Sequence, residues 1–251
     1  MNIDLSFSEF VNRNPLLKKY CTPEQKSFLE KEAIHCIYKK DDLIFREYDT
    51  AFNVFFIYSG IVELWKEGIY TEKQVIRFAK NGDLLGCRGI VMENSQYQLS
   101  ASALEDSKIY SVEKNVFAKI LKENSELNSQ ILQTYTKELE KVETRLRDMA
   151  NMNVREKVAE ALLILYNTLA TKEDNVALNI PLSRQTIADI AGTCKGRVIK
   201  QITEFRDENI LIGNGKKITI LRPDKLKEIV KKFHEIISFN MTTLLFIGAI
   251  S

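Results

Sequence analysis

Three basic residues, Lys195, Arg197 and Lys200, fall within six positions of one another in the stretch TCKGRVIKQI. Such side chains donate hydrogen bonds to phosphate oxygens and to the acceptor atoms of guanine in the major groove. Residues 184–222 contain eight basic and four acidic residues, although the whole chain has a net charge of only +2. This local excess of positive charge favours a polyanionic partner, and a solvated protein surface is the alternative.

The positions around these cations predict two short helices joined by a glycine. Ser183 can cap a first helix, which has Ile187 and Ile190 on its apolar side. Gly192 can adopt the tight conformation that ends this helix, and Thr193 can cap the second one. The inner face of the second helix is expected to contain Val198, Ile199, Ile202 and Phe205. A helix pair of this kind either binds DNA or only packs in a core.

The flanking sequence extends the helix pair into a larger unit. Residues 154–170 form an amphipathic run that Asn151 or Asn153 can cap at its start. Asn214 and Gly215 stand between two apolar alternating runs, which is a strong signal for a β-hairpin. The order helix, helix, turn, helix, hairpin is that of a winged helix-turn-helix domain.

Residues 37–112 have a different character, with short runs rich in β-branched and aromatic residues between turn residues. Examples are DLIFREY, NVFFIYSGIVELWKEG and KQVIRFAK. Gly60, Gly82 and Gly86 supply the backbone freedom that tight turns require. The pattern predicts an antiparallel barrel or jelly roll, preceded by a small helix over residues 23–32.

Neither proline nor glycine occurs between residues 115 and 166, so one or more long helices are expected there. Apolar residues recur at alternating spacings of three and four in part of this span, and charged residues flank them. This narrow apolar stripe favours a parallel coiled-coil dimer, and docking of the helix on the barrel is the alternative. The predicted dimer seam consists of Leu132, Tyr135, Leu139, Val142, Leu146 and Met149.

The barrel, the long helix and the stretch LSRQTIADIAGTCKGRVIKQITEFRDENILIGNGKKITIL together resemble the cyclic AMP receptor protein and fumarate-nitrate reductase regulator (Crp/Fnr) family of bacterial transcription factors. The resemblance covers about residues 20–222. It implies an α+β fold with a cyclic-nucleotide-binding-like jelly-roll barrel over residues 1–123 and a dimerisation helix over 124–150. A winged helix-turn-helix domain follows over 151–222, and residues 223–251 form an added helical extension.

The same resemblance implies a sequence-specific transcription regulator, and not an enzyme, with double-stranded DNA and RNA polymerase as partners. A homodimer is expected to read a near-palindrome with its two second helices in major grooves roughly 34 Å apart. Gly196 replaces a glutamate with which many relatives read cytosine, so a different target site is expected. The residues expected to contact DNA are Lys195, Arg197 and Lys200 on the second helix, Ser183, Arg184 and Gln185 at the first, and Lys216 and Lys217 on the hairpin.

Relatives that bind cyclic AMP use a glutamate and an Arg-Ser pair after a Gly-Asp turn. This chain keeps the turn but has Cys87 at the glutamate position and Tyr97 and Gln98 at the Arg-Ser positions. A cyclic phosphate needs a charge-assisted partner that tyrosine does not supply, so little or no cyclic nucleotide binding is expected. The corresponding pocket, with Gly86, Cys87, Arg88, Tyr97 and Gln98, either takes an unidentified effector or is filled by its own side chains.

The cysteines predict no metal or other cofactor. Cys21, Cys36, Cys87 and Cys194 are widely spaced and form no C-x-x-C pair, so an iron-sulfur cluster is not expected. Cys87 has Arg88 beside it, which could lower the pKa of the thiol and make it a redox sensor. The alternative is that Cys87 is a small buried apolar residue.

The cysteine pattern and the lack of an apolar leader favour a cytoplasmic protein. The final stretch IISFNMTTLLFIGAIS is interrupted by polar residues and is shorter than the roughly 20 apolar residues of a membrane span. We therefore expect a packing tail and no membrane partner, with a membrane anchor as the alternative. The alternative function is a signalling module whose barrel binds a small molecule or senses redox state and whose C-terminal domain contacts protein.

Overall fold

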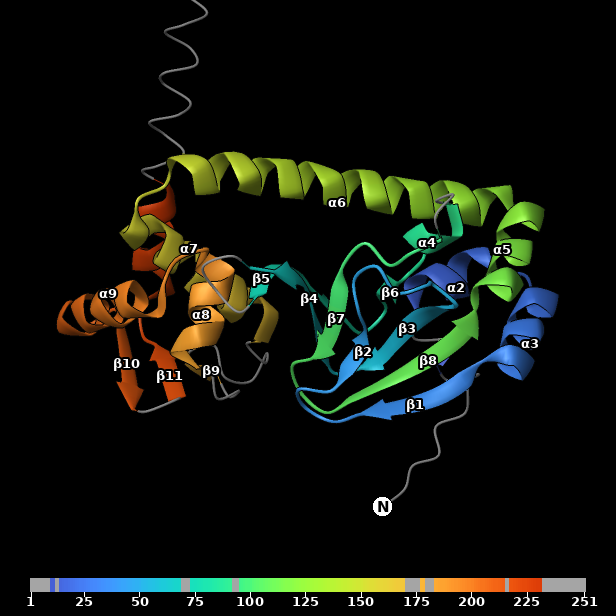
Figure 1. Cartoon of the computed structure of the whole chain (residues 1–251), viewed down its shortest axis with the longest axis horizontal. Coiled ribbons are helices and arrows are strands. Elements are labelled where there is room, and N and C mark those ends of the chain that lie inside the picture. Colours follow the sequence, from blue (N-terminus) through green and yellow to red (C-terminus); the bar gives the residue numbers. More distant parts are fainter. Residues whose placement is uncertain are drawn as a thin grey trace, which may run out of the picture. The chain divides into compact units, whose positions relative to one another are not determined.

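The computed structural model describes residues 10–11, 14–68, 73–91, 95–169, 177–178, 183–214 and 217–231 (Figure 1). The chain divides into two compact units. The first unit contains residues 1–66 and 75–143, and the second contains residues 67–74 and 144–251. Each unit has buried apolar residues of its own.

Two four-stranded antiparallel sheets form the centre of the first unit, with strand orders β1-β8-β3-β6 and β2-β7-β4-β5. Both sheets contribute side chains to one core, which includes Phe45, Phe55, Val62, Leu64 and Ile109. The predicted antiparallel β-rich region is therefore confirmed. The strands are β1 (Ile34–Tyr38), β2 (Leu43–Phe45), β3 (Asn53–Ser59), β4 (Ile61–Glu67), β5 (Lys73–Lys80), β6 (Leu84–Leu85), β7 (Ser100–Ala103) and β8 (Ser107–Glu113).

Short helices cover the other side of the β1-β8-β3-β6 sheet and form a second core with it. This core includes Phe10, Leu17, Phe56 and Phe117, which are all fully buried. The predicted helix at residues 23–32 is present and starts with a capping box. The helices of this unit are α2 (Pro15–Tyr20), α3 (Pro23–Glu32), α4 (Arg88–Val91) and α5 (Lys114–Glu123), together with most of α6 (Ser125–Asn151).

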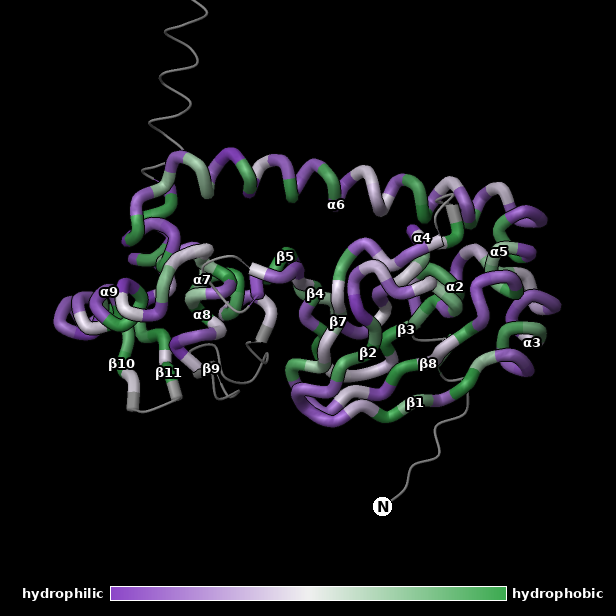
Figure 2. Tube along the Cα trace, viewed as in Figure 1, coloured by the Kyte–Doolittle hydropathy of each residue, from purple (hydrophilic) through white to green (hydrophobic). Residues whose placement is uncertain are grey.

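The long helix α6 has 27 residues, in agreement with the predicted long helix. Figure 2 shows hydrophobic residues at intervals along α6, separated by hydrophilic residues. Leu127 and Ile131 are buried in the core of the first unit. The later apolar residues of α6 are largely exposed.

The second unit contains three helices around a small antiparallel sheet with strand order β10-β11-β9. Asn153 caps the first helix, because its side-chain oxygen accepts a hydrogen bond from the Glu156 amide at 3.1 Å. A further helical segment covers residues 223–231, where Leu226 is fully buried. The elements are α7 (Val154–Leu169), α8 (Arg184–Ala191), α9 (Lys195–Asp207), β9 (Ala177–Leu178), β10 (Leu211–Asn214) and β11 (Lys217–Ile220).

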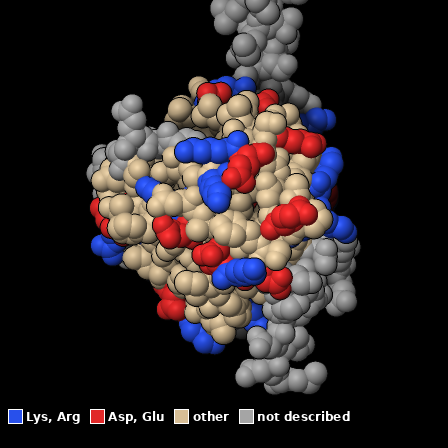
Figure 3. Space-filling view, turned by 90° about the vertical axis from the view of Figure 1, so that its right-hand side faces the viewer, with Lys and Arg blue, Asp and Glu red and all other residues tan. Residues whose placement is uncertain are grey.

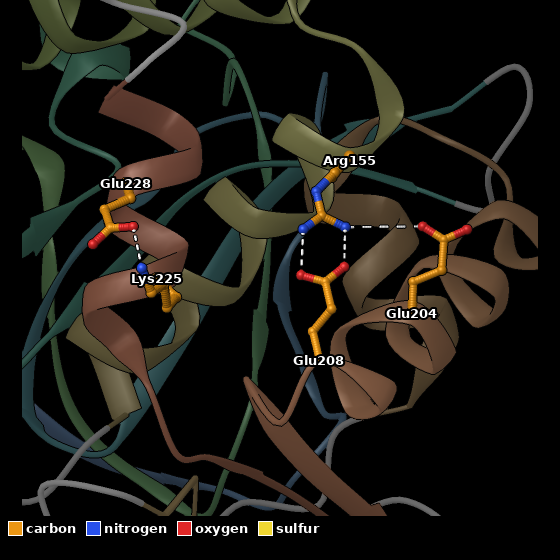
Figure 4. Close-up of polar contacts among 5 residues, drawn as sticks. All are labelled: Arg155, Glu204, Glu208, Lys225 and Glu228. Carbon is orange, nitrogen blue, oxygen red and sulfur yellow. Dashed lines mark hydrogen bonds and ion pairs between the residues drawn. The ribbon is translucent and has the colours of Figure 1, made fainter.

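A bidentate ion pair ties the start of α7 to the end of α9 (Figure 4). Both terminal nitrogens of Arg155 donate to the Glu208 carboxylate at 2.7 Å, and the guanidinium lies 4.9 Å from the centre of the Phe205 ring. The hydrogen bond from Arg155 lowers the pKa of Glu208 below its ordinary value. This pair fixes the end of α9 that lies away from its basic residues.

The predicted C-terminal extension is described only in part. Residues 223–231 are helical, and the apolar stretch from Phe233 onward lies outside the described residues. Within the described part of the chain, no helix combines the length and the apolar composition needed to cross a membrane.

Candidate nucleic-acid interface

The pair α8 and α9 forms the predicted helix-turn-helix. The Ser183 hydroxyl accepts a hydrogen bond from the Thr186 amide at 2.9 Å and so caps α8. Gly192 ends α8 in the left-handed conformation, with φ of +60°. A Cβ atom at Gly192 would collide with the Met149 side chain, so both the backbone angle and the packing favour glycine here.

Two details of the predicted turn are wrong. Thr193 is buried, and the N-cap of α9 is Cys194, whose side chain makes no capping hydrogen bond. Ile199 does not lie on the inner face of α9, because 47% of it is exposed. The inner face is formed by Val198, Gln201, Ile202 and Phe205, which are all buried.

Two side chains that the sequence did not single out brace α8. Arg145 on α6 donates through a terminal nitrogen to the Ile190 carbonyl oxygen at 2.6 Å. Gln74 at the start of β5 donates to the Asp189 carbonyl oxygen at 2.8 Å. Both acceptors are carbonyl groups of the last turn of α8, which have no partner within the helix. The local sequence around Arg145 and Gln74 gives no indication of these long-range contacts.

The three basic residues predicted to contact DNA lie together on the first two turns of α9. Lys195, Arg197 and Lys200 are exposed, and their side chains make no hydrogen bond or ion pair with any described residue. Several other cations of the second unit are paired, for example Arg155 with Glu208 and Lys225 with Glu228. The start of α9 is therefore a site where several positive charges remain available to a ligand.

Gly196 lies between these cations and is exposed. A Cβ atom built on it meets no other heavy atom within 4 Å. Because nothing in the protein requires glycine here, a longer side chain fits without strain. Because Gly196 has no side chain, there is open space at this position on the surface of α9.

Ile199 and Thr203 lie next to this open space, since residues three and four apart are neighbours on a helix surface. Both are exposed. The Thr203 hydroxyl donates to the Ile199 carbonyl oxygen at 3.0 Å, which leaves the methyl group of Thr203 as its outer atom. The exposed face of α9 thus contains a small apolar area beside Lys195 and Lys200, which the sequence analysis missed.

Two of the three residues predicted to contact phosphate at the start of α8 make hydrogen bonds within that helix. Ser183 caps α8, and its hydroxyl lies 2.9 Å from the Thr186 hydroxyl. Gln185 donates to the carboxylate of the buried Asp189 at 2.8 Å. Arg184 is half-buried, and burial lowers the pKa of its guanidinium. Ser183 and Gln185 therefore stabilise α8 itself, and one terminal nitrogen of Arg184 is buried without a hydrogen-bond partner among the described residues.

The two lysines predicted on the hairpin are not placed by the structure. Lys216 lies outside the described residues, and of Lys217 only the backbone, in β11, is described. The hairpin itself is present, with β10 and β11 paired in antiparallel register from Leu211 with Ile220 to Asn214 with Lys217. The predicted β-hairpin is therefore confirmed, without its lysine side chains.

Mixed charge covers another face of the molecule. In the view of Figure 3, Lys and Arg side chains alternate with Asp and Glu side chains. One exposed pair of this kind in the first unit is Lys39 with Asp106, at 2.7 Å. Surface pairs of opposite sign leave little net field for a polyanion.

The pocket predicted in the barrel of the first unit is almost completely filled. It has a volume of about 40 Å³ and is lined in part by Gly86, Arg88, Tyr97 and Gln98. The Tyr97 ring stacks on Phe45 with 4.1 Å between centroids. Its hydroxyl donates to the Asn53 carbonyl oxygen at 2.9 Å and accepts from the Asn53 amide at 3.2 Å. Tyr97 therefore occupies this space as a fixed part of the core.

The prediction that Cys87 lines this pocket is wrong. Cys87 is buried in the other core of the first unit, beside α6. Burial raises the pKa of the Cys87 thiol to about 12, so Arg88 does not make it a thiolate at neutral pH. The alternative expectation, a small buried apolar residue, describes its position better.

The predicted dimer seam lies mostly on the exposed side of α6. Leu139 is 58% exposed, and Leu132, Val142 and Leu146 are exposed as well. Tyr135 departs from this pattern, because it packs on the core of the first unit near Cys87. The last seam residue, Met149, is half-buried beside Gly192. Four large apolar side chains of α6 are thus left uncovered in a single chain.

Comparison with known protein families finds two domains, in the order predicted from the sequence. The cyclic nucleotide-binding domain model matches residues 36–124, and the Crp-like helix-turn-helix domain model matches residues 156–229. The chain belongs to the Crp/Fnr family of transcription regulators. The family resemblance drawn from the sequence is thereby confirmed.

Curated relatives of this Crp/Fnr regulator share modest identity over most of their length. The anaerobic regulatory protein of Bacillus subtilis is 25% identical over 75% of this chain and 80% of its own. The transcriptional activatory protein AadR of Rhodopseudomonas palustris is 24% identical over 81% of this chain and 84% of its own. These relatives are transcription regulators and not enzymes.

Solved structures of Crp/Fnr regulators share the fold. FixK2 from Bradyrhizobium japonicum matches with a TM-score of 0.67 at 22% identity, over 78% of this chain and 96% of its own. A Crp/Fnr regulator from Eubacterium rectale matches with a TM-score of 0.72 at 16% identity, over 88% and 99%. The predicted α+β fold, with a cyclic-nucleotide-binding-like domain, a long helix and a helix-turn-helix, is confirmed.

Proposed function

We propose that this Crp/Fnr regulator binds a near-palindromic DNA site as a homodimer, with the start of α9 in the major groove of each half-site. The observation that supports this is the group of exposed and unpaired cations Lys195, Arg197 and Lys200 around Gly196. Arginine and lysine bind guanine O6 and N7 or phosphate oxygens. With α9 in the groove, Ser183, Arg184 and Gln185 at the start of α8 lie near the DNA backbone, and Arg184 contacts a phosphate.

The apolar area on α9 adds base recognition of a different kind. A thymine presents its methyl group in the major groove, and apolar side chains recognise it by contact. Ile199 is the exposed apolar side chain that lies among the cations of α9. We therefore assign Ile199 to a thymine in each half-site. Gly196 leaves room for the neighbouring base pair, because it projects no side chain.

The second copy needed for the palindrome is provided by α6. Leu132, Leu139, Val142 and Leu146 form an exposed stripe with coiled-coil spacing. Pairing of this stripe with its copy removes four large apolar side chains from water on each chain. The two α9 helices of such a dimer reach half-sites about one helical turn, roughly 34 Å, apart.

The dimer binds DNA without a cyclic nucleotide in this proposal. Tyr97 fills the barrel pocket, and neither of the positions that hold the Arg-Ser pair in cyclic-AMP-binding relatives is basic. A contact with RNA polymerase, and residence in the cytoplasm, are expected from the family. Lys216 and Lys217 are expected to add phosphate contacts from the hairpin.

Selection of bound duplexes from a random pool, with the purified protein and no added ligand, tests the proposal. The expected product is a near-palindrome with half-sites about 10 base pairs apart from centre to centre. Affinity for the selected duplex is expected to fall steeply as salt rises, because phosphate contacts release counterions. Recovery of no consensus, or binding that does not depend on salt, would instead favour a module that contacts protein.

A further inference from the structure

The first unit has a second and larger cavity outside the barrel pocket. Its volume is about 390 Å³, roughly tenfold more than the space around Tyr97. Three elements line it: α2, the turn between β5 and β6, and the middle of α6. Cavities of about 300 Å³ or more hold small organic ligands in other proteins.

Hydrogen bonds fix the walls of this cavity before any ligand binds. The side chain of Asn14, which is fully buried, donates to the Gly82 carbonyl oxygen at 3.1 Å and so joins the start of α2 to the turn. Asn124 donates to the Tyr20 carbonyl oxygen at 2.8 Å and joins the end of α2 to the start of α6. The cavity is therefore preformed, which lowers the entropic cost of binding.

Charges of both signs line this cavity, on different walls. Lys19 is on α2, with its ammonium nitrogen 4.9 Å from the centre of the Tyr20 ring, which also lines the cavity. Asp83 is on the turn and Glu138 is on α6. Arg77, which lines the barrel pocket and not this cavity, lies 3.2 Å from the Glu138 carboxylate and partly offsets its charge. The remaining lining is mainly apolar and includes Leu16, Leu84 and Ile131.

We propose that this cavity binds a free α-amino acid with an apolar side chain. The ammonium group of the ligand faces the carboxylates of Asp83 and Glu138, and its carboxylate faces Lys19. Its side chain packs on Leu16, Leu84 and Ile131. A zwitterion fits a site with charges of opposite sign on separate walls, whereas a nucleotide would bring its phosphate close to two carboxylates.

Calorimetry with three small molecules tests the assignment on the full chain. L-phenylalanine and L-leucine are the amino-acid probes, phenethylamine lacks the carboxylate of phenylalanine, and 3-phenylpropionate lacks its ammonium group. We expect saturable binding of at least one amino acid, and at least tenfold weaker binding of both analogues. Failure of both amino acids to bind, or equal binding of the analogues, would overturn the proposal.

Two variants, one at a charged residue of the lining and one at the residue before it, test where the ligand binds. Lys19→Gln is expected to weaken amino-acid binding about tenfold, since it removes a charge-assisted partner, and to leave phenethylamine binding unchanged. Lys18→Gln, on the same helix but outside the lining, is the control and should bind like the wild type. An unaffected Lys19→Gln variant contradicts the site. No DNA is present, so the result is independent of the DNA-binding proposal.

Discussion

The barrel pocket and the start of α9 differ in what their side chains are bonded to. Tyr97 fills its pocket, stacks on Phe45 and satisfies its hydroxyl on Asn53. Lys195 and Lys200, in contrast, are exposed and have no partner among the described residues. Within this chain, the side chains of the barrel pocket are thus part of the core, while the basic side chains at the start of α9 remain available to a ligand.

Removing two cations of α9 should have the largest effect. Lys195→Ala with Lys200→Ala is expected to weaken binding to the selected duplex about 1000-fold, because each lost contact costs about 1–3 kcal/mol. The control is Lys119→Ala with Lys122→Ala on α5, which should bind DNA normally. Salt titration of fluorescence anisotropy measures both variants. Equal losses in the two variants would mean that only total charge matters.

Emptying the barrel pocket should affect stability and leave DNA binding intact. Tyr97→Ala is expected to lower the free energy of unfolding by about 3 kcal/mol, because it deletes a buried ring. Tyr97→Phe keeps the ring and should cost only about 1 kcal/mol, for the hydrogen bonds to Asn53. Urea denaturation gives both values. A Tyr97→Ala protein of wild-type stability would show that Tyr97 is not a structural part of the pocket.

A charge in the α6 stripe should disrupt the dimer. Leu139→Lys is expected to raise the dimer dissociation constant about 100-fold, since burial of each leucine contributes about 1.5–3 kcal/mol and both chains lose it. Glu140→Lys introduces the same residue one position later, on an exposed part of α6. Sedimentation velocity should show monomers only for Leu139→Lys. Dimers in both variants would place the interface elsewhere.

The thymine contact of Ile199 should have a smaller and local effect. Replacing one thymine per half-site with deoxyuridine removes two methyl groups from the whole site and is expected to weaken wild-type binding about 15-fold, at about 0.8 kcal/mol per buried carbon. Ile199→Ala should bind both duplexes equally. Ile212→Ala, at an isoleucine on β10 that is 53% exposed, should retain the preference. A methyl preference that survives in Ile199→Ala would exclude Ile199 as its source.

The ion pair at the far end of α9 should have the smallest effect. Arg155 lowers the pKa of Glu208, so the pair stabilises the fold above the ordinary glutamate pKa and loses this effect as the pH falls. Glu208→Gln is expected to cost about 0.5–1 kcal/mol at pH 7, since the pair is largely exposed, and less near pH 3. Glu228→Gln breaks the simpler pair with Lys225 and should cost less. A Glu208→Gln effect that is constant from pH 3 to pH 7 contradicts this role.

The sequence predicted the elements well where local patterns control them. Ser183 as a cap, Gly192 as a helix end and the hairpin after α9 follow from short-range rules, and all three are present. The inner face of α9 was predicted with Ile199 in the place of Gln201, because Ile199 is of a residue type common in cores but is 47% exposed. The residue type alone does not tell whether an apolar residue on a helix is buried in the core or exposed at the surface.

Long-range placement could not be predicted from the sequence. Cys87 lies next to pocket residues in the chain, but it faces the other core. Arg145 and Gln74 reach α8 from distant segments, and the cavity under α2 brings together residues more than 100 positions apart. These arrangements depend on how the elements pack, which local periodicity does not specify.

The contrast between a filled pocket and an open recognition helix is tested most directly by one binding titration. The wild-type protein is titrated into the selected duplex and into a shuffled duplex, each with and without cyclic AMP. The account predicts at least 1000-fold preference for the selected duplex, in the typical range for specific binding, and no change with cyclic AMP. Preference that appears only when cyclic AMP is added would contradict it.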